Sequence, residues 1–293
     1  MIISKLIGGL GNQMFQYAAG RSLSLSLETE YRIDISDFNN YSLHNGYELQ
    51  KVFSCDVPLA SKSDVKSIIG GDFQRSFNDF LLYAGLDFFS NKSFYREKSY
   101  NFSNNFFNLS PPAYISGYWQ SEQYFSCISS QIRSDFTFIQ PYSQDNLYVK
   151  DLIRSSSSSI SVHIRRGDYL TNNKANLFHG LCSLLYYKDA VKYITDRIID
   201  PTFFIFSDDP DWVNEYLILD FPTYIVNHNF GSESYNDMRL MSICDHHIIA
   251  NSSFSWWGAW LNPSDKKIII APKQWFANST APKDLLPNNW ISI

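Results

Sequence analysis

Residues 2–35 read IISKLIGGLGNQMFQYAAGRSLSLSLETEYRIDI and carry the clearest sign of the architecture. The apolar run at residues 2–7 predicts a buried strand, and the glycines of residues 8–11 form a loop that ends it. Residues 13–27 then predict a helix, and residues 31–35 predict a second strand. A strand, a glycine turn, a helix and a strand are the opening of a doubly wound α/β domain.

The second half of the chain repeats this rhythm. Its expected strands and helices are 160–164, 186–199, 202–206, 235–244, 247–250, 253–260 and 267–271. A chain of 293 residues is longer than the ~100–200 residues of a usual domain, so we expect two α/β domains. The serine run at residues 155–159 is typical of a linker, and we place the boundary between residues 145 and 146.

The segment between these halves gives weaker signals. Residues 55–110 are polar and aromatic, residues 73–89 are compatible with a helix, and residues 101–108 favour a loop. Residues 114–117 predict a short strand.

Composition excludes several classes of protein. The formal net charge is −5, without the basic excess of proteins that wrap nucleic acid, so we expect no nucleic-acid partner. No stretch reaches the ~18 apolar residues that a spanning helix needs. The four cysteines show no metal-ligand spacing and predict free thiols; they are Cys55, Cys127, Cys182 and Cys244. We expect a cytoplasmic protein, or one peripheral to the cytoplasmic membrane.

Residues 163–169, HIRRGDY, place two arginines at the end of an expected strand. Ligands of open α/β sheets bind at that end. Arg165 and Arg166 offer forked, permanently charged donors that match phosphate oxygens, and His163 and Arg165 point the same way along the strand. Asp168 can orient an arginine or accept from a ligand hydroxyl. The alternative is a structural cluster of ion pairs, but the flanking histidine and aspartate favour a ligand site.

The glycine loop offers a second candidate site. Gly9 and Gly11 allow close approach of a ligand to the backbone, and Asn12 and Gln13 are polar groups at the mouth of the loop. A tight turn with a helix cap explains the same residues. A dinucleotide fingerprint with Asp34 as its ribose acid is the other alternative, and it lacks the third glycine.

An acidic stretch follows the expected strand at residues 202–206. Asp208 could bind a ribose or a base edge. Asp209 and Asp211 match a DxD pattern that holds a divalent ion in one glycosyltransferase fold, although Asp209 is better explained as the cap of a helix beginning at Pro210.

Residues 251–258, NSSFSWWG, follow another expected strand. Ser252, Ser253 and Ser255 can cap the next helix or present hydroxyls and amides to a phosphate. The neighbouring Trp256 and Trp257 point in different directions, so at least one of them is expected in the core.

Five blocks, in this order, resemble the bacterial α-1,2-fucosyltransferase family. The HxRRxDY pattern of residues 163–169 is similar to the GDP-fucose motif shared by several fucosyltransferases. The other blocks are residues 8–18, 117–121, 206–209 and 250–261. They span the chain, although the segment 55–110 contains none.

The resemblance implies a GT-B fold, in which two Rossmann-like domains face a central cleft. Residues 1–145 would form the acceptor-side domain, and residues 146–293 would bind GDP-fucose. It implies an inverting, metal-independent transfer of L-fucose from GDP-β-L-fucose to the 2-hydroxyl of a terminal galactose, without a cofactor, in surface polysaccharide or O-antigen biosynthesis. The acceptor glycan and the oligomeric state stay open.

The resemblance also implies roles for single residues. Arg165 would hold the β-phosphate, and Asn12 would lie near fucose or the diphosphate. The remaining donor-site residues would be Gly9, Gly11, Gln13, His163, Arg166, Asp208, Ser252, Ser253 and Ser255. Arg165, Asp168 and Asn12 would be catalytic.

The base for the acceptor hydroxyl is open among Asp168, Glu122 and Asp37. Four other functions compete with this interpretation: a fucosyltransferase of another linkage, a metal-dependent transferase using residues 209–211, an NAD-dependent oxidoreductase and a non-catalytic glycan-binding protein.

Overall fold

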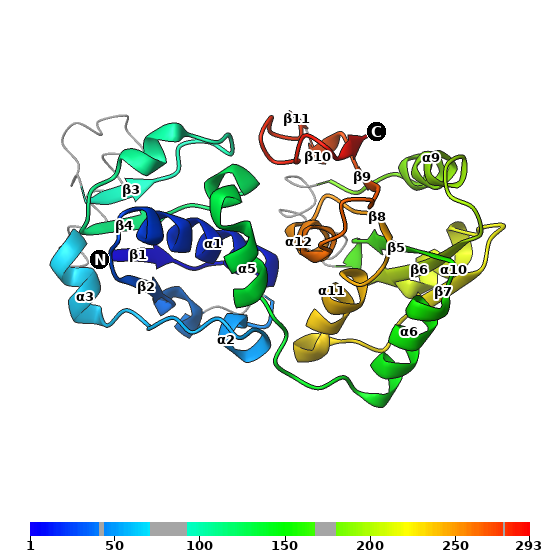
Figure 1. Ribbon diagram of the computed structural model, residues 1–293, viewed down its shortest axis with the longest axis horizontal. Helices are drawn as coiled ribbons and strands as arrows, with labels where there is room; N and C mark the ends of the chain where they lie inside the picture. The colour runs from blue at the N-terminus through cyan, green and yellow to red at the C-terminus, as the bar shows by residue number, and fades with distance from the viewer. Residues whose placement is uncertain (41–43, 71–92, 168–179, 278) are drawn as a thin grey trace. The chain divides into compact units, whose positions relative to one another are not determined.

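The computed structural model describes residues 1–40, 44–70, 93–167, 180–277 and 279–293 (Figure 1). The chain divides into two compact units, Met1–Ile139 and Gln140–Ile293, called unit 1 and unit 2 below. The boundary predicted between residues 145 and 146 falls inside helix α6 (Gln144–Ser155) of unit 2.

The serine run is not a linker, which corrects the expectation from its composition. Ser155 is the last residue of α6, and strand β5 begins at Ser158. The hydroxyls of Ser155 and Ser156 donate to the carbonyl of Leu152 at 3.0 and 2.8 Å. The same carbonyl also accepts from the backbone N–H of Ser156 at 3.2 Å, so the two serine hydroxyls reinforce the last turn of the helix.

Unit 1 is built on a parallel sheet of order β2-β1-β4-β3. Its strands are β1 (Ile2–Lys5), β2 (Tyr31–Asp34), β3 (Phe94–Arg96) and β4 (Ala113–Ser116). Helix α1 (Leu10–Ser26) joins β1 to β2. A Cβ atom on Gly20 of α1 would lie 2.0 Å from Ser4 Oγ and 2.6 Å from the Tyr31 ring, so a glycine lets the helix approach the sheet closely.

Short helices complete the described part of unit 1. They are η1 (Ser36–Asn40), α2 (Leu49–Val52), α3 (Lys62–Ile69), η3 (Asn104–Asn108), η4 (Glu122–Tyr124), η5 (Ser126–Ile128) and α5 (Ser129–Asp135). A loop was expected where η3 forms. Phe106 explains the difference, because it is fully buried against Trp119 and Tyr124 and fixes this segment. The helix predicted at 73–89 lies outside the described residues.

Unit 2 contains a six-stranded parallel sheet of order β12-β9-β8-β5-β6-β7. The strands are β5 (Ser158–Ile164), β6 (Pro201–Ser207), β7 (Thr223–Val226), β8 (His246–Ile248), β9 (Ile269–Ala271) and β12 (Ile291–Ser292). β10 (Gln274–Phe276) and β11 (Ser279–Thr280) form an antiparallel pair. The helices after α6 are α9 (Leu184–Thr195), α10 (Pro210–Tyr216), η6 (Gly231–Glu233), α11 (Tyr235–Met241) and α12 (Ser253–Leu261).

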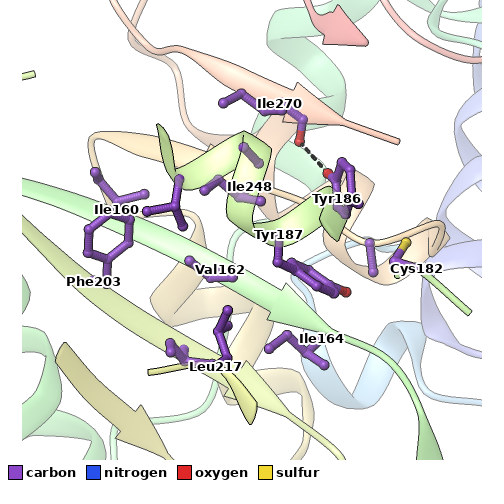
Figure 2. Close-up of a cluster of buried hydrophobic side chains, with 14 of the residues drawn as sticks. Ile160, Val162, Ile164, Cys182, Tyr186, Tyr187, Phe203, Leu217, Ile248 and Ile270 are labelled. Atoms are coloured by element: carbon purple, nitrogen blue, oxygen red, sulfur yellow. Dashed lines mark hydrogen bonds between the residues drawn. The ribbon is translucent and has the colours of Figure 1, made fainter. Parts of the chain in front are cut away.

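One face of β5 anchors a core beneath α9 (Figure 2). Ile160, Val162 and Ile164 alternate along the strand and are fully buried in this core together with Tyr187. The hydroxyl of Tyr186 donates to the carbonyls of Ile249 at 2.6 Å and Ile270 at 3.2 Å. The core thus fixes the central strand, at whose end the predicted arginines lie.

Both sheets have a point where the strand order reverses. In unit 2 the chain continues from β5 to β6 and β7 on one side and returns to β8 on the other. In unit 1 the flanking strands of β1 are β2 and β4. Ligands of open parallel sheets bind at the carboxyl ends of the strands beside such a point.

Candidate functional site

Arg165 and Asp208 form an ion pair at the carboxyl edge of the unit 2 sheet. Arg165 directly follows β5, and Asp208 directly follows its parallel neighbour β6. Arg165 Nη1 lies 2.9 Å from Asp208 Oδ2, while Asp208 Oδ1 accepts a 2.7 Å hydrogen bond from the backbone N–H of Arg166. The Arg165 side chain is 28% exposed. Asp208 therefore orients a cation that solvent still reaches.

Arg166 has a different environment from its neighbour. Its Nε lies 3.2 Å from Asp209 Oδ2, and its guanidinium lies 4.2 Å from the centroid of the Trp212 ring. The side chain is 17% exposed. These contacts attach Arg166 to the start of α10, and its predicted contact with phosphate stays a prediction.

Asp209 caps α10, as the sequence predicts. Its Oδ1 accepts from the N–H of Trp212 at 3.2 Å, and its Oδ2 pairs with Arg166. Both carboxylate oxygens are thus engaged, which leaves the DxD pattern with Asp211 a weak candidate for a metal site. Within the described ranges of the chain, no three His, Cys, Asp or Glu side chains gather to hold a metal ion.

His163 ends β5 in a buried position, 6% exposed. Its ring lies 5.7 Å from that of Phe254 in the first turn of α12, which brings the predicted blocks at 163–169 and 251–258 together. Among the described residues, its buried Nδ1 has no hydrogen-bond partner. Burial lowers the pKa of His163 to about 4; Asp208 opposes this shift and Arg165 adds to it. The ring is therefore neutral at pH 7.

The low pKa of His163 predicts a loss of stability in acid. The unfolded chain takes up this proton near pH 6.5 and the folded chain only near pH 4, so the free energy of unfolding falls as pH drops through that window. Between pH 7 and pH 4.5 we expect about 2–3 kcal/mol from this residue. Urea unfolding of wild type and His163→Phe at both pH values measures it. An equal loss of stability in the two proteins would contradict the assignment.

The serines before α12 divide into two kinds. Ser252 is the N-cap of α12, and its hydroxyl accepts from the N–H of Phe254 at 3.3 Å. Ser255 is fully buried, and its hydroxyl donates to the carbonyls of Ala250 and Ser252. Ser252 and the partly exposed Ser253 thus lie at the helix terminus, where backbone amides favour an anion. Ser255 stabilises the turn from inside, and its predicted contact with the donor stays a prediction.

The glycine loop of unit 1 lies at the corresponding edge of its own sheet. Gly9 is the N-cap of α1, Gly11 and Asn12 lie in its first turn, and a Cβ on Gly8 would lie 2.8 Å from Asn12 Nδ2. Asn12 Oδ1 accepts a 2.8 Å hydrogen bond from Gln120 Nε2. Sequence reasoning assigned no role to Gln120, although its place in the block 117–121 was a signal that could have found it.

Gln13 makes structural contacts within unit 1, and its predicted contact with the donor stays a prediction. It is fully buried, and its Nε2 donates to the carbonyls of Gly8 at 2.9 Å and Gly46 at 2.8 Å. Its Oε1 accepts from the N–H of Glu48 at 3.0 Å. The Gln13 side chain thus links residues 46–48 to the glycine loop through hydrogen bonds.

Asp34 cannot serve as the ribose acid of a dinucleotide site as it stands. It is 3% exposed, and its oxygens accept from the Tyr114 hydroxyl at 2.7 Å and the Ser36 N–H at 2.9 Å. The bond from Tyr114 ties β2 to β4 across the sheet, and the bond from Ser36 holds the turn that follows β2. The oxidoreductase alternative therefore loses its acidic residue.

The three candidate bases differ in their exposure and their contacts, and one of them is not described. Asp168 lies outside the described residues. Asp37 pairs with Lys5 at 2.8 Å and is 40% exposed, and Glu122 begins η4 in a partly exposed position. The base stays open among these three residues.

The arrangement in unit 2 suits an anionic ligand. An oriented, partly exposed arginine, a neutral histidine and the N-terminus of a nine-residue helix converge beside the point where the strand order reverses. A family model for glycosyl transferase family 11 matches residues 72–293, which include all of these groups. The chain belongs to glycosyltransferase family 11. This confirms the family that the five blocks predicted.

Two full-length relatives of this family 11 glycosyltransferase come from Escherichia coli. An alpha-1,2-colitosyltransferase is 37% identical, with 100% of this chain and 99% of the relative covered. The O-antigen biosynthesis glycosyltransferase WbnK is 35% identical, with 99% of each covered.

Solved structures support the fold of this family 11 glycosyltransferase. The fucosyltransferase NodZ from Bradyrhizobium superposes with a TM-score of 0.53 at 16% identity, covering 89% of this chain and 93% of NodZ. The predicted α/β class of GT-B type is confirmed. All four cysteines are free, also as predicted.

Proposed function

We propose that this family 11 glycosyltransferase moves L-fucose from GDP-β-L-fucose to the 2-hydroxyl of a terminal galactose, with inversion at the anomeric carbon. The observation that carries the proposal is the Arg165–Asp208 pair beside His163 and the start of α12. In this pair Asp208 orients the guanidinium of Arg165, which offers charged donors where a diphosphate would bind at the edge of the unit 2 sheet. The names of family relatives support a 6-deoxy sugar and an α-1,2 linkage.

The reaction forms a bond between the acceptor oxygen and C1 of fucose while the bond from C1 to the β-phosphate oxygen breaks. The electron pair leaves on GDP, and the proton of the acceptor hydroxyl passes to a general base, for which Asp168, Glu122 and Asp37 are the candidates. Arg165 stabilises the negative charge that develops on the leaving phosphate, and the amides at the start of α12 add to this. Such preorganised donors typically contribute ~10²–10³ in rate. We propose that these groups act without a metal ion.

A second donor sugar deserves direct comparison, because one full-length relative is a colitosyltransferase. Colitose differs from L-fucose by the absence of the 3-hydroxyl group. A site that hydrogen-bonds this hydroxyl would discriminate strongly against colitose, whereas a site without such contacts would accept both sugars.

Release of GDP from GDP-fucose, GDP-colitose and GDP-mannose in the presence of lactose or a related galactoside tests the proposal. We expect turnover with GDP-fucose, an α-1,2 linkage in the product by NMR, and the same rate in excess chelator. Loss of activity in chelator would support the metal-dependent alternative. Glycan binding without turnover of any donor would support the non-catalytic alternative and overturn the proposal.

In the described part of the chain, no helix is long and apolar enough to cross a membrane. We propose a cytoplasmic enzyme, or one peripheral to the cytoplasmic membrane, acting on a galactose-terminated glycan of O-antigen or another surface polysaccharide. The name of the relative WbnK supports this acceptor class.

A further inference from the structure

A carboxylate in unit 1 holds the turn that follows β4. Trp119 in this turn has a backbone φ of 55°, in the left-handed region that a bulky residue rarely adopts. Glu97, the first residue after β3, accepts from the N–H of Tyr118 at 2.6 Å and from the N–H of Trp119 at 3.1 Å. One side chain therefore engages two consecutive donors of a strained turn.

The approach of Glu97 to this turn requires a glycine at position 117. A Cβ atom there would lie 2.4 Å from the Cβ of Glu97 and 2.8 Å from its Oε2. The backbone N–H of Glu97 also donates to the carbonyl of Ser116 at 2.9 Å. On the other side, Trp119 is 1% exposed and stacks on Tyr95 with ring centroids 5.8 Å apart. The carboxylate and the turn are thus held together from both sides.

The residue after Trp119 connects the turn to the glycine loop. Gln120 donates from Nε2 to Asn12 Oδ1 at 2.8 Å, across 108 residues of chain. We propose that Glu97 is a positioning residue for sugar transfer: its ionised carboxylate holds the 117–120 turn, and the turn holds Asn12 through Gln120. The part of this inference that concerns transfer rests on the proposed function, whereas the part that concerns the turn does not.

The charge of Glu97 changes in the neutral pH range. Burial raises the pKa of this carboxyl to about 7, although the N–H groups of Tyr118 and Trp119 favour the ionised form. Tyr100 and Tyr118, whose ring centroids lie 6.0 Å apart, both interact electrostatically with it. The pKa of each tyrosine is raised, mainly by burial, so both are neutral at pH 7. Hydrogen bonds to a charged acceptor are stronger than those to a neutral one, so the turn is held more firmly above pH 7 than below it.

The pH dependence of one backbone amide tests the turn directly. In protein labelled with 15N-tryptophan, the Trp119 amide signal is identified by its loss in Trp119→Phe. We expect this amide shift to titrate with a midpoint near pH 7 in the wild type and not in Glu97→Gln, which keeps the length and one carbonyl acceptor. A flat wild-type titration, or the same titration in Glu97→Gln, would overturn the inference. The measurement needs no substrate, so its result is independent of the proposed function.

Kinetics test the link to Asn12. We expect Glu97→Gln to lower kcat about 10- to 100-fold, to abolish the rise of kcat through pH 7, and to leave GDP affinity unchanged. Gln120→Ala should lower kcat similarly, and the double variant should be no worse than the poorer single variant, because both act through Asn12. A double variant whose loss of kcat equals the product of the two single losses would contradict the proposal that Glu97 acts through Gln120 and Asn12. Asp56→Asn is the matched control, because it neutralises an exposed carboxylate of unit 1, and it should keep wild-type kcat.

Discussion

Arg165→Ala is expected to lower the rate of sugar transfer by about 10²–10³ while the protein stays folded. The Arg165 side chain follows the end of β5, is 28% exposed and is oriented by Asp208. Its removal therefore eliminates the positive charge that stabilises the leaving group, and it leaves the hydrophobic core intact. Steady-state kcat/KM for GDP-fucose measures the loss, and circular dichroism with thermal unfolding checks the fold. A folded Arg165→Ala enzyme that keeps most of its activity would refute the assigned role.

The neighbouring arginine supplies the matched control. Arg166 lies against Trp212 and Asp209, so Arg166→Ala should reduce the thermal midpoint more, and transfer less, than Arg165→Ala does. Arg165→Lys should fall between wild type and Arg165→Ala, because lysine keeps the charge and loses the planar fork. If Arg166→Ala proves the poorer catalyst at a temperature where both variants are folded, the roles of the two arginines must be exchanged.

Trp256→Ala is expected to reduce the free energy of unfolding by about 3–5 kcal/mol. The side chain is fully buried, and its ring lies 6.2 Å from that of Trp260 and 5.2 Å from that of Trp290. Its indole N–H donates to the carbonyl of Leu285 at 2.9 Å, so truncation leaves both a cavity and an unsatisfied acceptor. Urea denaturation of wild type and variant measures the change.

Two further substitutions separate these causes. Trp256→Phe keeps most of the ring volume and should cost less than half as much, chiefly through the lost hydrogen bond. Leu185→Ala removes a 66% exposed side chain from α9 of the same unit and should change stability by less than ~0.5 kcal/mol. A Trp256→Ala protein as stable as Leu185→Ala would show that this tryptophan cluster does not stabilise unit 2.

Sequence periodicity predicted the regular elements well where burial is strong. Two buried strands, β5 with its alternating apolar residues and β6 with its continuous apolar run, were found within one or two residues of their expected ends. The linker at residues 155–159 and the loop at 101–108 were wrong. In both segments, residue types that are typical of loops make specific tertiary or capping contacts. In the first, the Ser156 hydroxyl donates to a helix carbonyl, and in the second, Phe106 is buried.

Residue type alone could not separate the members of the candidate site. Arg165 and Arg166 are adjacent and chemically identical, yet one is a partly exposed cation and the other is stacked on Trp212. Asn12 and Gln13 also differ, because both the nitrogen and the oxygen of the Gln13 side-chain amide are hydrogen-bonded to the backbone of unit 1. Which neighbour faces the ligand depends on the direction of each side chain at the end of its element.

The sequence by itself determined the family, the α/β class, and the strand ends at which the arginines, the glycine loop and the serine turn would lie. Those features are local, because they follow from side-chain periodicity and from short motifs. The tertiary structure decided that Asp208 orients Arg165, that Gln120 holds Asn12, and that Glu97 holds the turn before Gln120. These partners are 43, 108 and 21 residues apart, and they meet only because particular strands are neighbours in their sheets. Strand order is a property of the folded sheet, and no single stretch of the sequence contains it.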